Sequence, residues 1–209
     1  MGRNFHLQKN DIVLVLQDET KVPNGEDIPY MKGKEVMVIP KSEFTTGHMK
    51  WADQIICATN KTRETLNKQM RNLLGYSGDL PQDGEKMICL RNYWDDISED
   101  GEFALVNGTT GIIRRPYDSY RMAPPYSRVK NKKMENVTAD FYTEEGAEFC
   151  SVEMDKQMLL TGEYSLDWRE SYDLGKLKKR IGDIAPRQFT YGYAMTCWKA
   201  QGSEWDKVL

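Results

Sequence analysis

The sequence predicts an α/β domain that is interrupted by a small inserted β domain. Residues 54–75 have the pattern of a strand, a polar loop and an amphipathic helix, which is half of a βαβ unit. Gly, Pro and Asp then cluster over 75–86, as they do at domain junctions, and several short strand-like segments follow. The apolar segment 189–196 again has the pattern of a core strand of an α/β sheet. The simplest arrangement places the β domain between two parts of the α/β domain.

The strand, loop and helix contain the first candidate site. Residues 54–59, "QIICAT", form a short apolar strand, and a polar turn follows it. In the helix, Thr62 is the expected N-cap and Gly75 the expected end. One helical face is apolar and is formed by four residues: Leu66, Met70, Leu73 and Leu74. Because ligands of open α/β sheets bind beyond the carboxyl ends of the strands, the loop after this strand is a candidate binding site.

The inserted domain is predicted from short strands with alternating apolar residues. Val137, Ala139 and Phe141 alternate with polar residues, and the Asn107-Gly108 pair between two apolar runs predicts a hairpin turn. This pattern is typical of a small barrel. The strands are expected in four segments: 86–92, 103–115, 136–142 and 148–154.

Two apolar segments precede this core. Residues 35–40 predict a strand that Pro40 ends. Residues 11–16, "DIVLVL", are rich in branched side chains, which favours a strand, but Asn10 or Asp11 could equally cap a short helix. We leave these two interpretations of 11–16 open.

Composition excludes several classes of protein. The 209 residues carry a net charge of -3, which excludes a uniformly basic nucleic-acid binder but permits a local basic patch. No apolar run approaches the roughly 20 residues of a membrane span, and the N-terminus has no signal core, so no membrane contact and a cytoplasmic location are expected.

His6 and His48 lie far apart and the cysteines form no CxxC pair, so we expect reduced thiols and no metal site. The four cysteines are Cys57, Cys89, Cys150 and Cys197.

The chain contains no catalytic motif of its own. It has neither a G-x-x-x-x-G-K-[ST] loop nor a G-x-G-x-x-G loop, so it has no Gly-rich cradle for phosphates. Two histidines do not provide a Ser-His-Asp set. We therefore expect no catalytic residue within this chain.

The last residues carry the most specific motif. The segment 193–209, "YAMTCWKAQGSEWDKVL", resembles motif V of superfamily 1 DNA helicases, in particular the RecD-like (exodeoxyribonuclease V alpha-type) branch. The departures are Trp198, where the family usually has His, and Cys197, where Val is frequent. Ten positions match at the family's spacing: Tyr193, Ala194, Thr196, Lys199, Gln201, Gly202, Ser203, Glu204, Trp205 and Asp206.

Two upstream segments extend the resemblance. Residues 54–71 look like the motif IV region, in which a strand and loop lead to a helix with an "LN" pair, here Leu66-Asn67. Residues 84–92 and 105–113 resemble the SH3-like barrel that follows in these enzymes. The order motif IV, barrel, motif V also agrees with the family. The stretch near 115–185 is variable.

The resemblance implies an incomplete RecA-like (P-loop NTPase-type) second motor domain with an inserted SH3-like β-barrel. Its first part would span 1–80, of which 1–53 resemble the family only loosely. The barrel would span 81–185, and the motor domain would return over 186–209. Motifs I to III with the Walker A loop would precede the chain, and motif VI with an arginine finger would follow it. The chain is thus expected to be a fragment.

The activity implied by the resemblance is that of the whole parent protein. It would be an ATP-dependent DNA helicase or translocase, moving 5′ to 3′ on single-stranded DNA in recombination or repair. ATP and Mg²⁺ would be cofactors of the parent only, with none bound to the fragment. The expected partners are single-stranded DNA and the missing N-terminal motor domain. Accessory repair or replication proteins, and an associated nuclease, are not specified by the sequence.

The resemblance also implies roles for individual residues. Each has a plainer alternative: Arg63 as a surface arginine, Gly202 as a helix C-cap and Trp198 as a packing residue. The loop residues Thr59 and Asn60 could merely shape the turn. The nucleotide-facing set is Arg63, Gly202, Ser203 and Glu204, and the DNA-facing set is Thr59, Asn60, Thr196, Trp198, Lys199 and Gln201.

A basic and aromatic stretch, 114–133, fits single-stranded nucleic acid equally as well as a solvated, flexible loop with three prolines. The lysine-rich run 176–180 favours a solvated face. Two other functions compete with a helicase: a non-catalytic nucleic-acid-binding module that keeps motif V as structure, and a protein-interaction barrel on a degenerate α/β scaffold.

Overall fold

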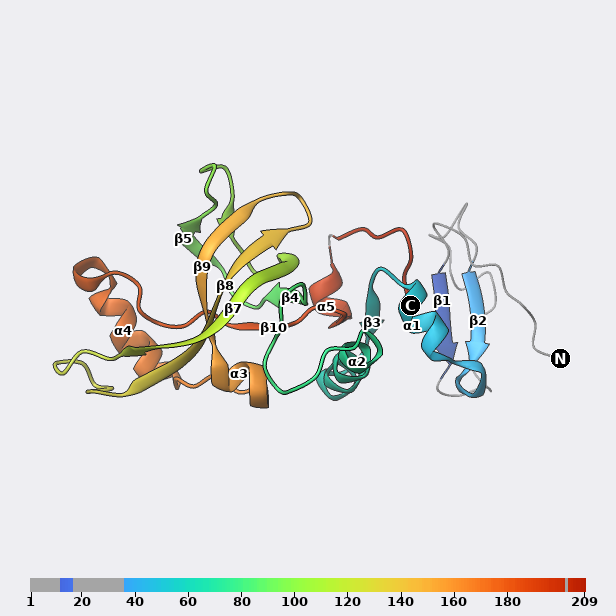
Figure 1. Ribbon diagram of the computed structural model, residues 1–209, viewed down its shortest axis with the longest axis horizontal. Helices are drawn as coiled ribbons and strands as arrows, with labels where there is room; N and C mark the ends of the chain where they lie inside the picture. Colours follow the sequence, from blue (N-terminus) through green and yellow to red (C-terminus); the bar gives the residue numbers. More distant parts are fainter. Residues whose placement is uncertain (1–11, 17–35, 202) are drawn as a thin grey trace. The chain divides into compact units, whose positions relative to one another are not determined.

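The computed structural model describes residues 12–16, 36–201 and 203–209, and these form a mixed fold of helices and sheets (Figure 1). Two compact units are present. One consists of the residues up to Gly75 together with Tyr193–Leu209, and the other is Tyr76–Gly192. No helix among the described residues is both long enough and apolar enough to cross a membrane.

The first unit begins with a parallel pair of strands, β1 (Ile12–Leu16) and β2 (Val36–Pro40). The segment for which a strand and a helix were both open is therefore a strand. The strand expected over 35–40 is confirmed, and it ends at Pro40 because proline has no N–H for a ladder. A 3-10 turn, η2 (Lys41–Glu43), and a short helix, α1 (Thr46–Trp51), follow. The caps considered at Asn10 and Asp11 lie outside the described residues.

A second parallel pair joins residues far apart in the sequence. Strand β3 (Ile55–Cys57) pairs with β11 (Ala194–Thr196), so the expected strand within 54–59 is confirmed. On the other side of β3, Gln54 forms a parallel bridge with Val208. The segment 207–209 therefore lies beside β3, and β3 has neighbours on both sides.

Helix α2 (Asn60–Leu73) starts earlier than predicted. Thr59, rather than Thr62, is the N-cap, because its hydroxyl accepts a hydrogen bond from Thr62 N at 3.1 Å. Gly75 ends the helix as predicted, and its φ of 87° is the left-handed conformation that glycine adopts without strain.

The buried face of α2 is less apolar than predicted. Met70 is buried, whereas Leu74 is 47% exposed. Two polar residues, Asn67 and Arg71, are buried in its place. The helix thus packs on the sheet partly through polar contacts, which the apolar periodicity did not predict.

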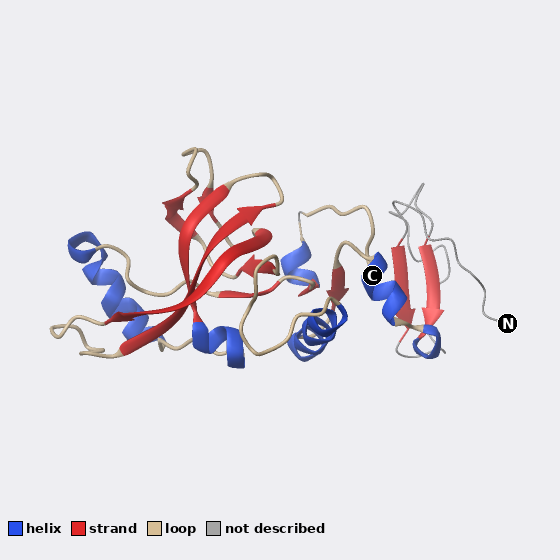
Figure 2. Ribbon diagram, in the orientation of Figure 1, coloured by secondary structure: helices blue, strands red, loops and turns tan. Residues whose placement is uncertain are grey.

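The second unit is built on a five-stranded antiparallel sheet in the order β10-β4-β7-β8-β9 (Figure 2). A separate pair, β5 (Tyr93–Ile97) and β6 (Ala104–Leu105), accompanies it. Its apolar core contains Phe141, whose ring meets that of Phe189 edge-on at 5.2 Å. The five strands are β4 (Lys86–Cys89), β7 (Thr110–Met122), β8 (Lys133–Thr143), β9 (Glu148–Asp155) and β10 (Phe189–Tyr191).

The expected SH3-like barrel is not shown by these pairings. The sheet is open in its strand order, with β9 and β10 at its two edges, and no closed barrel is found among the described residues. A single parallel bridge links Met154 of β9 to Arg187, two residues before β10. What the structure establishes is therefore a five-stranded antiparallel sheet.

The hairpin expected at Asn107-Gly108 is wrong, although a turn does occur there. Gly108 has a φ of 95°, and Thr109 N donates to Val106 O at 3.2 Å. However, β6 pairs with β5, while β7 pairs with β4 and β8. The reason is that the turn bonds elsewhere: Gly108 N donates to Cys89 O, and Asn107 N to Asn92 Oδ1.

The single core strand expected over 189–196 is also wrong. Its first half, β10, pairs antiparallel with β4, and its second half, β11, pairs parallel with β3. Gly192 lies between them, where a Cβ atom would stand only 3.0 Å from the carbonyl group of Met87. The chain therefore changes sheets at a residue that has no side chain.

Three helices complete the fold: α3 (Lys156–Thr161), α4 (Trp168–Ile181) and α5 (Cys197–Ala200). Helix α4 was not among the elements predicted from the sequence. The interpretation of 114–133 as a loop holds only for 123–132, because β7 and β8 occupy the rest. Beside α4 lies a small apolar cluster formed by Ala123, Val129, Met134, Leu166 and Leu174.

Candidate functional site

The two predicted motif loops meet at one edge of the parallel pair. Cys57 at the end of β3 is in register with Thr196 at the end of β11. Because the strands are parallel, the residues that follow each of them emerge at the same edge. The Cys57 thiol donates to Met195 O at 3.4 Å, and the Cys197 thiol donates to Cys57 O at 3.6 Å. The segments 57–63 and 196–201 are therefore neighbours.

The loop after β3 is shaped by the start of α2. Thr59 and Asn60 are both exposed, at the N-cap and the first helical residue. The Thr59 hydroxyl is already used, since it bonds to Thr62 N and lies 2.9 Å from the Thr62 hydroxyl. Its capping role explains this threonine structurally. Asn60 has an exposed amide that can donate to and accept from a ligand.

Arg63 is held close beneath this edge. Its side chain is only 14% exposed, and one terminal nitrogen lies 3.3 Å from Glu64 Oε1. Its Nε is buried and has no hydrogen-bond partner among the described residues. Burial raises the pKa of the nearby Cys57 thiol, and the positive charge of Arg63 acts in the opposite direction. Arg63 therefore has one unused donor, but that donor is buried, so an anion could reach it only if the side chain moved.

The segment after β11 presents a mixture of donors and one large aromatic side chain. Thr196 is the N-cap of α5 without a side-chain cap bond, and Gln201 is its exposed C-cap. Trp198 is 81% exposed, so the packing alternative for this tryptophan is wrong for the described residues. Lys199 is half-buried on the same helical turn. Hydroxyl, amide, ammonium and indole groups together suit a nucleic-acid backbone and its bases.

The structure does not assemble the whole predicted nucleotide-facing set. Ser203 and Glu204 are exposed, and Ser203 N donates to Ala200 O at 3.2 Å. No contact of either side chain with Arg63 occurs within the described residues. Gly202 lies outside them. No group of three or more His, Cys, Asp and Glu side chains in the described part of the chain is arranged to hold a metal ion.

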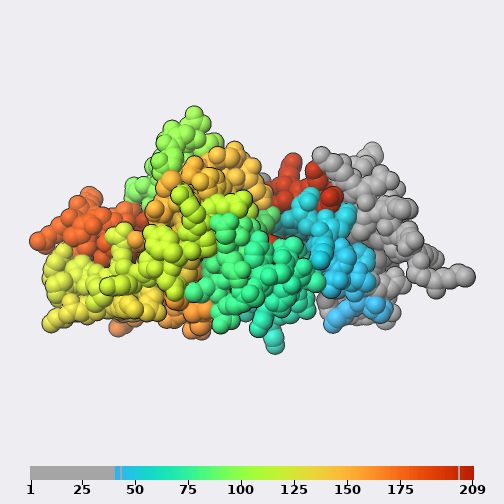
Figure 3. Space-filling model, in the orientation of Figure 1, coloured from blue at the N-terminus to red at the C-terminus, as the bar shows by residue number. Residues whose placement is uncertain are grey.

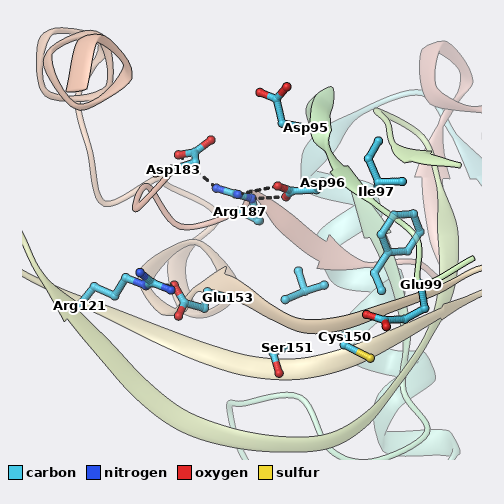
Figure 4. Close-up of a pocket in the computed structure, with 12 residues that line it drawn as sticks. Asp95, Asp96, Ile97, Glu99, Arg121, Cys150, Ser151, Glu153, Asp183 and Arg187 are labelled. Atoms are coloured by element: carbon cyan, nitrogen blue, oxygen red, sulfur yellow. Dashed lines mark hydrogen bonds and ion pairs between the residues drawn. The ribbon is translucent and has the colours of Figure 1, made fainter. Parts of the chain in front are cut away.

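A pocket that the sequence did not predict lies in the second unit (Figure 4). It encloses about 270 Å³, and five acidic residues and two arginines are among its lining residues. Arg187 is central: it bonds to both carboxylate oxygens of Asp96, at 2.5 and 2.8 Å, and lies 3.3 Å from Asp183. Arg121 is paired with Glu153 at 2.5 Å. Both guanidinium groups are thus neutralised.

The charge of this pocket decides what it can bind. Burial acts to lower the pKa of Arg187, but the hydrogen bond to Asp96 and the charges of Asp183 and Asp96 together raise it, so Arg187 stays charged and paired. The surplus of carboxylates repels phosphates, which excludes the pocket as a nucleic-acid or nucleotide site. Its network instead ties β5 to the segment before β10, since Asp96 belongs to β5. The sequence carried no signal for it, because the partners lie 91 residues apart.

Comparisons with solved structures include a distant similarity to a helicase. No protein family and no curated protein matches this sequence. Among solved structures, the chain is similar to the Pif1 helicase from Candida albicans, with a TM-score of 0.40 and 13% sequence identity. The match covers 84% of this chain and 50% of that one, so this chain spans half the length of the matched protein. A match this distant establishes neither a family nor an activity for this chain.

Proposed function

We propose that this chain is part of an ATP-dependent DNA helicase or translocase of the RecD-like branch of superfamily 1. It would form the second motor domain and contact single-stranded DNA. The observation that carries this proposal is the parallel pairing of β3 with β11, which brings the motif IV loop and motif V to one edge. Two motifs that are about 140 residues apart in the chain are thereby adjacent, as a shared ligand requires.

The DNA-facing residues have chemistry that suits this role. Asn60, Thr196 and Gln201 offer neutral hydrogen bonds to phosphate oxygens, and Lys199 adds a positive charge. Thr59 contributes by capping α2 and so orienting Asn60. Trp198 is exposed enough to stack on a base. The set therefore combines backbone contacts with one stacking contact, without base-specific pairing.

The nucleotide-facing residues would complete a site formed by another domain. Arg63 has the guanidinium geometry for a phosphate, once its buried and unpaired Nε becomes accessible. Ser203 and Glu204, which belong to motif V, are exposed. ATP and Mg²⁺ would be held by a Walker A loop, which this chain lacks. The five-stranded sheet would be the inserted small barrel, which the bridge between Met154 and Arg187 supports.

Hydrolysis of ATP tests this proposal. The coding sequence that encodes this chain should also encode a Walker A loop, and that whole protein should hydrolyse ATP faster when single-stranded DNA is added. The 209-residue chain alone should not hydrolyse ATP. Lys199→Ala in the whole protein should weaken the stimulation by DNA, whereas Lys68→Ala, an exposed position on α2, should not. Turnover by the chain alone would contradict the proposal.

A non-catalytic nucleic-acid-binding module is the second candidate. The observation in its favour is Trp198, which replaces the usual histidine of motif V while the rest of the motif is retained. It predicts DNA binding without a Walker A loop in the coding sequence and without ATP hydrolysis.

A further inference from the structure

We propose that helix α4 and the loop between β7 and β8 form a second surface for single-stranded nucleic acid, within the unit Tyr76–Gly192. We call it the α4 surface. It rests on the proposed function only for the identity of its ligand, because its geometry is independent of motif V. It consists of Tyr126, Trp168, Arg169, Tyr172, Lys176, Lys179 and Arg180.

Apolar packing holds the two segments together. Ala123, Val129 and Met134 on the hairpin pack with Leu174 of α4 in the small apolar cluster. In Figure 3 the hairpin, in yellow, and the helix, in orange, lie side by side. Two basic stretches that are separate in the sequence, 114–133 and 176–180, therefore become one surface.

The packing places the acidic residues of α4 on the side that faces the hairpin. Its two acidic residues face the hairpin: Glu170 Oε2 lies 2.9 Å from Lys132 Nζ, and Asp173 Oδ2 accepts from Arg128 N at 2.7 Å. On the opposite side Trp168, Tyr172 and Lys176 follow one another at intervals of four residues, and hence share a face. The acidic side chains are thus removed from the face that remains open to solvent.

The outer face of α4 is accordingly cationic. Arg169, Lys176, Lys179 and Arg180 are exposed, and none of them forms an ion pair with another residue that the structure describes. Lys178, in contrast, points to the side and is paired with Asp95 and Asp183. Although the whole chain has a net charge of -3, every charged side chain of the α4 surface is basic.

The aromatic side chains of this surface are exposed and each lies next to a cation. Trp168 is 73% exposed, with Arg169 5.3 Å from its ring, and Tyr172 is 62% exposed, with Lys176 at 4.4 Å. The link to the hairpin is Tyr126, whose ring lies 5.2 Å from the guanidinium of Arg180.

This combination selects one kind of ligand. Exposed rings stack on unpaired bases, and adjacent cations contact the phosphates between them. Duplex DNA offers phosphates but no free base faces, so it would use only the charges. Single-stranded nucleic acid uses both, and the ring–cation pairs are already formed before it binds. An acidic peptide would use only the charges as well, and the test separates it from the proposed ligand.

Fluorescence anisotropy with labelled oligo(dT) across a salt series tests the proposal on this chain, in a background of Trp198→Ala and Lys199→Ala that removes the contribution of the segment after β11. Replacing both Trp168 and Tyr172 by Ala should weaken binding about tenfold or more, with an unchanged salt slope. Replacing Lys176 and Lys179 by Gln should lower the slope of log affinity against log salt by about 1.4, since each phosphate contact to a single strand contributes about 0.7. The matched controls are Trp94→Ala, 66% exposed in β5, and Lys68→Gln.

The outcomes are distinguishable. All replaced side chains are exposed, so the variants should keep the parental unfolding midpoint. Differences in affinity between them would then reflect binding and not unfolding. Equal losses in the variants and the controls, no binding at low salt, or equal binding of poly-glutamate would each overturn the α4 surface. Failure of the proposed function would show differently, as a whole protein without DNA-stimulated ATP hydrolysis, and would leave these binding results unchanged.

Discussion

The side-chain amide of Asn67 forms both possible hydrogen bonds with the backbone of Ala194. Its Oδ1 accepts from Ala194 N at 2.7 Å, and its Nδ2 donates to Ala194 O at 3.1 Å. Asn67 lies on α2 and Ala194 on β11, so the amide continues the hydrogen bonding of the sheet at an edge where none of the described strands follows. This contact links helix α2 directly to strand β11.

Asn67→Ala should destabilise the first unit strongly. Asn67 is 3% exposed and Ala194 is fully buried, so the change leaves two buried backbone groups without partners. We expect a loss of about 3 kcal/mol in the free energy of unfolding, since each such group costs about 1–3 kcal/mol. Urea unfolding measures it. Gln69→Ala, at an exposed position on the same helix, should change stability by less than about 0.5 kcal/mol.

Two Gly→Ala substitutions in the second unit should have opposite effects. A Cβ at Gly111 would lie 2.8 Å from the carbonyl carbon of Tyr142 and closer still to its oxygen, on the neighbouring strand β8. Gly111→Ala should therefore destabilise by about 3 kcal/mol. Gly175 lies in α4 with open space around its Cβ position, so Gly175→Ala should stabilise by about 0.5–1 kcal/mol. Thermal unfolding of both variants is the check. A shift of the two unfolding temperatures in the same direction would contradict the steric difference between these two glycine positions.

Trp198 should report on DNA binding directly. If it stacks on a base, its fluorescence should fall when oligo(dT) binds, and Trp198→Ala should weaken binding by about 1–3 kcal/mol. Subtracting the signal of Trp198→Phe isolates this tryptophan from the other four. Because its side chain is 81% exposed, the substitution should leave thermal stability unchanged. An unchanged affinity in Trp198→Ala would rule out stacking by this residue.

Cys150 should alkylate slowly although it is exposed. Desolvation, a hydrogen bond to Glu99 and the nearby charges of Glu148 and Asp140 raise the pKa of its thiol to about 11. At pH 8 only about one thiol in a thousand is then the reactive thiolate, and the rate should rise about tenfold per pH unit up to that pKa. Peptide mass spectrometry after iodoacetamide treatment measures this rate.

The control for Cys150 is Glu99→Gln. It removes a negative charge beside the thiol, so it should lower the pKa and speed alkylation at pH 8. Cys89, which is fully buried, should react only after unfolding. A Cys150 rate that is independent of pH between 7 and 10 (about four units and about one unit below the expected pKa) would contradict the raised value.

Helix α4 begins with a capping box and ends before a glycine, and both features can be recognised in the sequence. Asp167 caps it by accepting from Arg169 N and Glu170 N, and Glu170 completes a capping box by accepting from Asp167 N. Gly182 follows its last residue with a φ of 77°. Both signals are local and present in the sequence. The density of charges hid the helix because only Leu174 on it is fully buried.

The sequence by itself determined several local elements: β3, the end of α2 at Gly75, and the strands β4, β8 and β9 of the second unit. These follow from side-chain periodicity and from turn and cap chemistry, which act over a few residues. The tertiary structure alone decided that Gly192 separates two sheets, that Asn67 completes the edge of β11 and that α4 turns its acidic residues toward the hairpin. Each of these depends on a partner that is distant in the chain, and local pattern does not specify which strand or helix will supply that partner.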